Sequence, residues 1–462
     1  MVSIDRARIR ELMAQEEARF AEAHPRSKEL FERAKGSLLA GVPMNWMVAW
    51  TGAFPMFMAS AKGARVKDVD GHTYVDFCLG DTGSMFGHSP KPAVDAIVRQ
   101  ARRGITTMLP SEDSIWVGEE LARRFGLPYW QVALTATDAN RFAIRLAREA
   151  TGRRKILVYR GCYHGSVDES LVDLRDGRVV SRIGNIGAPV NPSDTTKAIE
   201  FNDVSALEAA LAPGDVACVL AEPAMTNCGI ILPDPGYHDA LREATRRTGT
   251  LLILDETHTI CAGPGGYTAA HGLRPDLITL GKPIGSGVPM AAYGISQDVA
   301  ERILARVTGE GADESGIGGT LSGNVLAAAA TRATLERIMT KEAFDQMISL
   351  AERLEDGVAA VIKEFDVPWN VVRLGARVEY RFHPIPPRNG GEADATKDPE
   401  LDRLVHLYML NRRVLLTPFH NMCLMSPATT ERDVDRHNRV FRSCARELAG
   451  RRTRRVQSPS IT

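Results

Sequence analysis

The sequence predicts an α/β fold in which a large domain with a mostly parallel sheet, flanked by helices, is joined to a smaller α+β domain. Between residues 90 and 330, short β-branched runs alternate with helical patterns. Several of these runs, such as "LLILD" at 251–255, are continuously apolar, which is typical of strands covered on both faces. The chain has 462 residues, 44% of them apolar, which is enough for a large core and a second, smaller unit.

The N-terminal segment, residues 1–85, is expected to form part of the small domain. Residues 6–38 have a polar helical pattern that Pro25 interrupts, because proline has no N–H to donate within a helix. The stretch 64–77 alternates apolar and polar residues around Asp70-Gly71, which indicates a β-hairpin.

The middle segment, residues 86–330, is expected to form the large domain. Its strands and helices alternate as they do in βαβ units. We expect strands at 131–137, 155–161, 216–223, 250–257, 276–282 and 291–296, and helices at 139–150 and near 236–248.

The C-terminal segment, residues 331–462, is helix-rich and is expected to complete the small domain. It contains a second α+β pattern around 371–382. The polar insertion at 384–400 is interpreted as a mobile surface loop. The basic run at 451–455 is interpreted as a solvated, frayed tail rather than a binding patch.

Composition narrows the class of partner. The 57 basic residues balance the 57 acidic ones, which argues against a nucleic acid or a membrane surface as partner. The seven cysteines show no metal-ligand spacing, and they fit reduced thiols in the cytoplasm. The sequence contains no signal peptide and no apolar run as long as a membrane span.

Two strand ends carry unusual charges. Asp255 ends the apolar run "LLILD", and Lys282 ends "LITLGK" twenty-seven residues later. In a parallel sheet both side chains fall at the same edge, where ligands bind. A lysine with little access to water becomes a nucleophile. The ordinary alternative is a partly buried salt bridge between the two.

An anion site is predicted at the same edge. The stretch 131–150 is a strand, a short turn and a helix whose apolar residues form one stripe (Phe142, Ala143, Leu146, Ala147 and Ala150). The N–H groups at the helix N-terminus attract anions, and the hydroxyls of Thr135 and Thr137 add donors. The ordinary alternative is a helix cap. A carboxylate, a lysine and an anion site together match pyridoxal 5'-phosphate, which has a ring nitrogen, an aldehyde and a phosphate.

The sequence resembles the class III, fold-type-I family of pyridoxal-phosphate-dependent aminotransferases, in the branch near glutamate-1-semialdehyde aminomutase. The resemblance covers about residues 35–450 and is carried by the stretches "AKGARVKDVDGHTYVDF", "RLAREATGRRKILVYRGCYHG", "LAEPAMTNCGIILPDPGYHDALRE", "LLILDETHT", "PDLITLGKPIGSGVPMAAYG" and "GGTLSGNVLAAAA".

The resemblance implies a role for each matching residue. Lys282 forms the Schiff base and moves protons, and Asp255 pairs with the pyridine nitrogen. Ala136 and Thr137 bind the phosphate, while Tyr163 stacks on the ring. Three further residues are Asn227, near the phenolic oxygen; Thr320, which reaches the phosphate of the neighbouring subunit in a homodimer; and Glu222, a buried structural acid. The ordinary alternative makes Tyr163 and His164 plain residues of a strand-end loop.

The sequence also departs from the family pattern. Ala136 replaces a glycine, Asp138 a glutamate and Thr257 an apolar residue, and each change affects cofactor affinity. His258 is interpreted as a packing or surface histidine. Where relatives that act on amino acids carry an arginine for the substrate carboxylate, this chain has Trp46, with Trp50 nearby. These tryptophans favour an apolar or aromatic amine. Two arginines beside the insertion are the alternative carboxylate ligands, Arg381 and Arg388.

Three functions follow as hypotheses. The first is a transaminase that passes an amino group from a primary amine, aromatic or bulky, or from a β-amino acid to a keto acid by a ping-pong mechanism. The alternative is an aminomutase of the glutamate-1-semialdehyde type, which needs no added keto acid. The third is a cofactor-binding regulator without turnover. The N-terminal ninety residues disfavour it, because they show neither a basic surplus nor a helix-turn-helix pattern.

Overall fold

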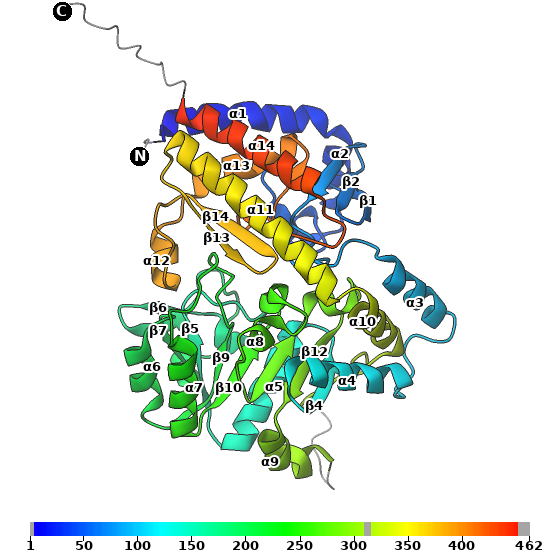
Figure 1. Cartoon of the computed structure of the whole chain (residues 1–462), viewed down its shortest axis with the longest axis vertical. Helices are drawn as coiled ribbons and strands as arrows, with labels where there is room; N and C mark the ends of the chain where they lie inside the picture. Colours follow the sequence, from blue (N-terminus) through cyan, green and yellow to red (C-terminus); the bar gives the residue numbers. More distant parts are fainter. Residues whose placement is uncertain (1–3, 309–315, 451–462) are drawn as a thin grey trace, which may run out of the picture.

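The computed structural model describes residues 4–308 and 316–450. The basic run at 451–455 lies outside the described residues. Figure 1 shows two halves, with the N- and C-terminal segments together in the upper half and the middle of the chain in the lower half. Among the described residues, no helix is both long enough and apolar enough to cross a membrane.

The lower half is built on a seven-stranded sheet. Its strand order is β4-β12-β11-β10-β9-β5-β8, and β12 runs antiparallel to both of its neighbours while the other pairs are parallel. The predicted mostly parallel sheet is therefore confirmed. The strands are β4 (Tyr129–Ala133), β5 (Lys155–Tyr159), β8 (Thr196–Ile199), β9 (Val216–Ala221), β10 (Leu251–Asp255), β11 (Leu277–Leu280) and β12 (Ala291–Ile295).

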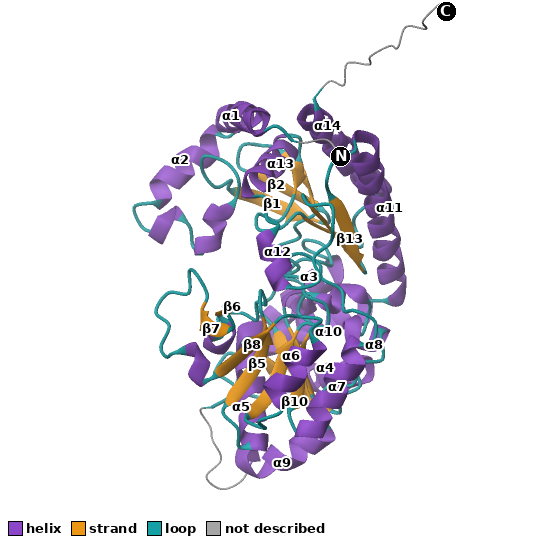
Figure 2. Cartoon of the chain, turned by 90° about the vertical axis from the view of Figure 1, so that its left-hand side faces the viewer, coloured by secondary structure: helices purple, strands orange, loops and turns teal. Residues whose placement is uncertain are grey.

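Helices flank this sheet, as Figure 2 shows in its lower part. Helix α5 (Ala136–Thr151) contacts β9, β11 and β12 through the predicted stripe, of which Ala143, Leu146 and Ala147 are buried. It ends at Gly152, whose φ of 67° is one that glycine adopts without strain. The other helices of this half are α3 (Lys91–Ala101), α4 (Glu112–Phe125), α6 (Val204–Leu211), α7 (Tyr237–Thr248), α8 (Gly266–Ala270), α9 (Gln297–Thr308) and α10 (Val325–Arg337).

The upper half joins the two ends of the chain. Its four-stranded sheet has the order β1-β2-β3-β15, so a C-terminal strand pairs in parallel with an N-terminal one. Hairpin β2–β3 is the one predicted around Asp70-Gly71. The strands of the two sheets in this half are β1 (Met58–Lys62), β2 (Arg65–Asp68), β3 (Thr73–Asp76), β15 (Val414–Leu415), β13 (Asn370–Leu374), β14 (Arg377–Arg381) and β16 (Met422–Leu424).

Long helices cover these sheets. Helix α1 packs against α13, and α11 packs against α14. The predicted break at Pro25 is confirmed, because α1 ends at Ala23 and α2 begins at Pro25. The helices are α1 (Arg6–Ala23), α2 (Pro25–Ala34), α11 (Lys341–Phe365), α13 (Pro399–Asn411) and α14 (Glu431–Ala449).

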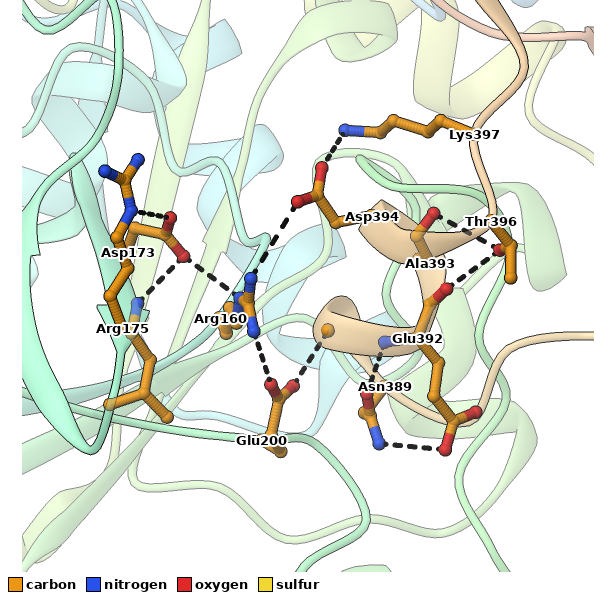
Figure 3. Close-up of polar contacts among 12 residues, drawn as sticks. Arg160, Asp173, Arg175, Glu200, Asn389, Glu392, Ala393, Asp394, Thr396 and Lys397 are labelled. Carbon is orange, nitrogen blue, oxygen red and sulfur yellow. Dashed lines mark hydrogen bonds and ion pairs between the residues drawn. The ribbon is translucent and has the colours of Figure 1, made fainter.

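The insertion at 384–400 is not the loose loop that the sequence suggested. It contains helix α12 (Gly390–Ala395), which is fixed to the large sheet (Figure 3). Glu200, just after β8, accepts from the Gly391 N–H at 3.1 Å and from Arg160 Nη1 at 3.3 Å. Arg160 Nη2 also lies 3.8 Å from Asp394 on α12. Polar residues in this insertion therefore form contacts between the two halves rather than facing only solvent.

Candidate active site

A cavity of about 650 Å³, the main cavity, lies at the carboxyl-end edge of the large sheet. Both halves of the chain contribute to it, since Trp46 and Asp81 come from the N-terminal segment and Asp255 and Lys282 come from strand ends. The placement of Asp255 and Lys282 at one edge is the one expected for parallel strands.

Lys282 follows β11 and has a left-handed backbone, with φ of 48°. Its ammonium Nζ donates to Asp81 Oδ2 and to His258 Nε2, each at 2.7 Å. The ordinary alternative of a salt bridge with Asp255 is therefore wrong, because each of the two side chains has other partners in the structure.

Asp255 ends β10 and is 3% exposed. Its carboxylate accepts from His164 Nδ1 at 2.8 Å, from Asn140 Nδ2 at 2.9 Å and from the Thr257 N–H at 3.0 Å. Burial alone would raise the pKa of Asp255, but the hydrogen bond and positive charge of His164 outweigh it and lower the pKa to about 2. The cavity is therefore lined by a carboxylate that is ionised at neutral pH.

The N-terminus of α5 opens onto the same cavity. Thr135 is its N-cap and accepts from the Asp138 N–H at 3.2 Å, so the helix-cap alternative holds for this residue. Ala136 and Thr137 begin the helix and line the cavity. Thr137 Oγ1 accepts from the Ser166 N–H at 3.2 Å, and a hydroxyl in that position still has its own hydrogen to donate. These two residues stand where an anion would be bound.

Ala136 fits at this position because the residue that faces it, Gly281, has no side chain. A Cβ on Gly281 would lie 2.8 Å from the Ala136 Cβ, closer than two carbons approach in proteins. The departure from glycine at 136 is thus accommodated by the bare backbone of Gly281, directly before Lys282.

Aromatic side chains form part of the wall of the main cavity. Trp46 and Trp50 both line it, as does Tyr163. Trp46 is 39% exposed, and its ring lies edge-on to Tyr163 and to Phe419, with centroids 5.3 Å and 5.6 Å away. Burial raises the pKa of Tyr163 above its usual value. The structure therefore places both tryptophans at the cavity.

Asn227 lies beside the main cavity rather than on its wall. It lines a smaller adjoining space of about 240 Å³, the side cavity, together with Tyr163, Asp81 and Arg182. Its Nδ2 donates to Glu222 Oε1 at 2.9 Å. Glu222 is buried, which raises its pKa, and it orders this turn through its hydrogen bonds.

Three residues proposed from the sequence lie away from the main cavity. Thr320 is exposed and does not line it within its own chain. Arg381 donates to the backbone carbonyls of Cys228 at 2.7 Å and Ala393 at 2.6 Å, so its guanidinium holds the insertion in place. Arg388 is an exposed residue that pairs with Asp234. The position of Arg388 gives no support to a role in binding a substrate carboxylate. Arg381 lines a neighbouring cavity of about 460 Å³ that shares Trp50 and Phe419 with the main cavity.

His258 is neither a surface residue nor a packing residue, which corrects the expectation from sequence. It is 7% exposed and contacts Lys282 directly. Asp81, the other partner of Lys282, was not singled out from the sequence, and His164, which donates to Asp255, was named only as a possible plain residue of a strand-end loop. One signal was present for His258, because it follows Asp255 by three residues at the same sheet edge.

The residues around the main cavity fit pyridoxal phosphate. An amine, an ionised carboxylate and a helix N-terminus surround one space, matching the three groups of that cofactor. In addition, His164 Nε2 and Thr257 Oγ1 are buried polar atoms that line this region and have no hydrogen-bond partner among the described residues. A polar ligand would satisfy such atoms.

Comparison with known proteins supports this interpretation. The family model for aminotransferase class-III matches residues 47–430. A glutamate-1-semialdehyde 2,1-aminomutase of Sorangium cellulosum (strain So ce56) is 34% identical over 443 residues, covering 93% of this chain and 97% of its own. The chain belongs to the class-III aminotransferase family.

Solved structures of similar proteins lead to the same family. A glutamate-1-semialdehyde aminomutase from Pseudomonas aeruginosa PAO1 is 53% identical, with a TM-score of 0.94 over 96% of this chain and 99% of that one. A variant of it has been solved in complex with PMP. An omega-transaminase from Sphaerobacter thermophilus is 27% identical, with a TM-score of 0.85 over 92% and 98% of the two chains. The predicted fold type I and the predicted cofactor, pyridoxal phosphate, are confirmed.

Proposed function

We propose that the protein is a pyridoxal-phosphate-dependent aminomutase of the glutamate-1-semialdehyde type. The observation that carries the proposal is the likeness to aminomutases along nearly the whole chain, at 53% identity for one solved structure. The function named as the alternative from sequence thus takes precedence over the transaminase. Such an enzyme moves an amino group from one carbon of its substrate to another without a second substrate.

Each residue has a task in this proposal. The N-terminus of α5 binds the phosphate through the backbone of Ala136 and the hydroxyl of Thr137. Asp255 would pair with the ring nitrogen and keep it protonated, and Tyr163 would lie against the ring. When bound, the cofactor supplies a reversible covalent link to amines and a ring that accepts electrons. The Lys282 amine would take the proton from the substrate carbon that bears the amino group.

A transaminase remains the second candidate on one specific observation. The described lining of the main cavity contains tryptophans at positions 46 and 50 and includes no arginine. A substrate carboxylate is usually held by the two-pronged guanidinium of an arginine. An apolar or aromatic amine suits this wall better, and its amino group would pass to a separate keto acid.

The requirement for an acceptor distinguishes the two. The cofactor-loaded protein is incubated with glutamate-1-semialdehyde alone, and the isomer with the amino group on carbon 1 is measured. We expect many turnovers without any keto acid. A single turnover that resumes only when a keto acid is added would establish the transaminase instead.

Three further statements belong to this proposal. The chain acts as a homodimer, with Thr320 at the partner's cofactor. It works in the cytoplasm, where its cysteines stay reduced. The chain divides at about residues 85 and 330 into the segments given above, with 86–330 binding the cofactor.

A further inference from the structure

The amine of Lys282 is held at two points. Asp81 Oδ2 and His258 Nε2 each lie 2.7 Å from its Nζ. The two acceptors come from separate parts of the chain, since Asp81 follows β3 and His258 follows β10. Both line the main cavity together with the lysine.

The backbone is strained at this contact. Asp81, Thr82 and Lys282 all have left-handed φ angles, of 52°, 79° and 48°. Residues other than glycine adopt such angles at a cost in free energy, and they do so mainly where the surrounding structure needs a side chain in one position. The strained residues are thus Lys282, its acceptor Asp81 and the neighbouring Thr82.

The imidazole of His258 is oriented to accept. An amine of lysine has only donors to offer when charged, so Nε2 must present its lone pair. The other ring nitrogen, Nδ1, lies 2.9 Å from Thr82 Oγ1. Because a hydroxyl oxygen can accept the Nδ1 hydrogen, Thr82 accommodates the tautomer that leaves Nε2 free to accept from Lys282.

Burial and nearby positive charges keep the same ring neutral. Arg377 is 1% exposed, and its Nη1 lies 3.4 Å from His258 Nδ1. Burial and the positive charges of Lys282 and Arg377 lower the pKa of His258 well below its usual value, against the opposing pull of Asp81 and Asp255. Arg377 is itself fixed by Thr226 O at 2.7 Å and Glu379 Oε2 at 3.2 Å. Asp81 also faces His420 and Tyr163.

We propose that Asp81 and His258 are positioning residues that orient the Lys282 amine. A neutral amine has two N–H bonds and one lone pair. When both N–H groups donate to these acceptors, the direction of the lone pair is fixed. The acceptor pair therefore aims the lone pair at the reacting atom and limits rotation of the amine. This inference rests on the proposed role of Lys282, but it is the same for an aminomutase and a transaminase.

The test compares variants that keep or remove an acceptor. His258→Gln places an amide oxygen near the position of Nε2, whereas His258→Phe fills the space without an acceptor. In the cofactor-loaded protein, we expect His258→Phe to lower kcat about 100-fold with KM changed less than about threefold, since misplacing a reacting group by about 1 Å costs that much. His258→Gln should stay within about threefold of the wild type. The matched control is His238→Gln on α7.

A second measurement needs neither substrate nor cofactor. In the cofactor-free protein, labelling of Lys282 by an amine-selective reagent is timed at one fixed pH by peptide mass spectrometry. Asp81→Asn keeps an acceptor but removes a negative charge 2.7 Å from the amine. We expect Lys282 to be labelled about tenfold faster in this variant, because the carboxylate favours the charged amine, which does not react. His258→Gln should change the labelling rate less than about twofold, as one neutral acceptor replaces another.

Three results would overturn the proposal. One is a folded His258→Phe variant with wild-type kcat, and another is a His258→Gln variant as slow as His258→Phe. The third is an unchanged rate of Lys282 labelling in Asp81→Asn. Circular dichroism establishes folding, and if His258→Phe fails to fold, the His258→Gln and Asp81→Asn results decide. Because labelling involves no substrate, a failure here is distinct from a failure of the proposed function.

Discussion

His164 donates from Nδ1 to Asp255 Oδ2 over 2.8 Å, in a contact that both side chains make out of reach of water. Burial alone would lower the pKa of His164, but the neighbouring Cys162 and Asp255 side chains outweigh it and raise the pKa to about 10. We attribute the rise chiefly to Asp255, whose carboxylate is ionised at neutral pH. The histidine thus favours the charged form of Asp255, which the proposed pairing with the cofactor's ring nitrogen needs.

The first prediction concerns stability and pH. The pKa of His164 is raised in the folded protein, so its stabilising contribution is complete below about pH 6.5 and is lost as the pH rises through about 10. The pKa of Asp255 is lowered, so its contribution is present above about pH 3.8 and is lost as the pH falls through about 2. The unfolding free energy lost in His164→Gln should therefore shrink between pH 7 and pH 10 in urea titrations of the cofactor-free protein.

The control for this effect is a double-mutant cycle. In an Asp255→Asn background, the same His164→Gln change should cost an amount that no longer varies over this pH range. A cost that stays constant from pH 7 to pH 10 in the wild-type background would contradict the ion pair.

Much of the site could be predicted because strand ends of a parallel sheet share one edge. That rule alone brought Asp255, Lys282 and the start of α5 together, and all three line the main cavity. Continuous apolar runs likewise predicted the strands, because burial on both faces leaves a strong pattern in the sequence.

The remaining residues of the site could not be predicted, because no pattern of residue types in the sequence marks them. Asp81 reaches Lys282 only because its own backbone and that of Thr82 adopt left-handed angles, which no spacing of residue types reveals. His258 lies close in sequence to Asp255, but no spacing reveals that its Nε2 contacts Lys282 while its Nδ1 contacts Thr82 from the other half. The insertion was misjudged because its many polar residues indicate solvent, whereas several of them bind the large sheet.

The second prediction removes the reacting amine. Lys282→Ala should lower kcat at least about 1,000-fold, as loss of a covalent catalytic group does. The visible absorbance of the bound cofactor should disappear as well, since its link to the lysine is lost. Lys341→Ala changes an exposed lysine on α11 and serves as the control. Native turnover in Lys282→Ala would remove the basis for every role assigned here.

The third prediction concerns Arg182, which lines the side cavity beside Tyr163 and donates to the Cys162 carbonyl. If the substrate has a carboxylate, Arg182 is an arginine that could meet it from the side cavity. Arg182→Ala should then raise KM for a carboxylated substrate about 10- to 100-fold, as loss of a charged hydrogen bond does. KM for a plain aromatic amine should change less than about threefold.

Arg178→Ala on β7 (Arg178–Ser181) is the matched control, because that side chain is exposed and lies outside the lining of both cavities. Equal changes in KM for the carboxylated and the plain amine would show that Arg182 does not recognise a carboxylate.

The fourth prediction concerns Thr320. This residue is exposed and does not line the main cavity of its own chain, as expected of a group that serves a neighbouring subunit. Thr320→Ala should weaken cofactor binding about tenfold, the effect of losing one hydrogen bond to a charged group. Thr320→Ser keeps the hydroxyl and should restore binding, as measured by equilibrium dialysis. An unchanged Kd in Thr320→Ala, at protein concentrations where the dimer is present, would rule out this contact.

The fifth prediction concerns the close approach of α12 to the large sheet in Figure 3. A Cβ on Gly390 would lie 2.1 Å from the Arg160 carbonyl oxygen, so Gly390→Ala must move α12 away from β5. That movement breaks the hydrogen bond from Gly391 to Glu200 as well. We expect proteolytic cleavage within 384–400 to become about tenfold faster, corresponding to about 1.4 kcal/mol less stability against local opening. Global unfolding should change less, because the helices of the upper half do not depend on this contact.

Lys397→Ala removes only an exposed ion pair with Asp394, which contributes little, and its cleavage rate should match the wild type. Equal cleavage rates in Gly390→Ala and Lys397→Ala would mean that α12 is held by contacts other than those with Arg160 and Glu200.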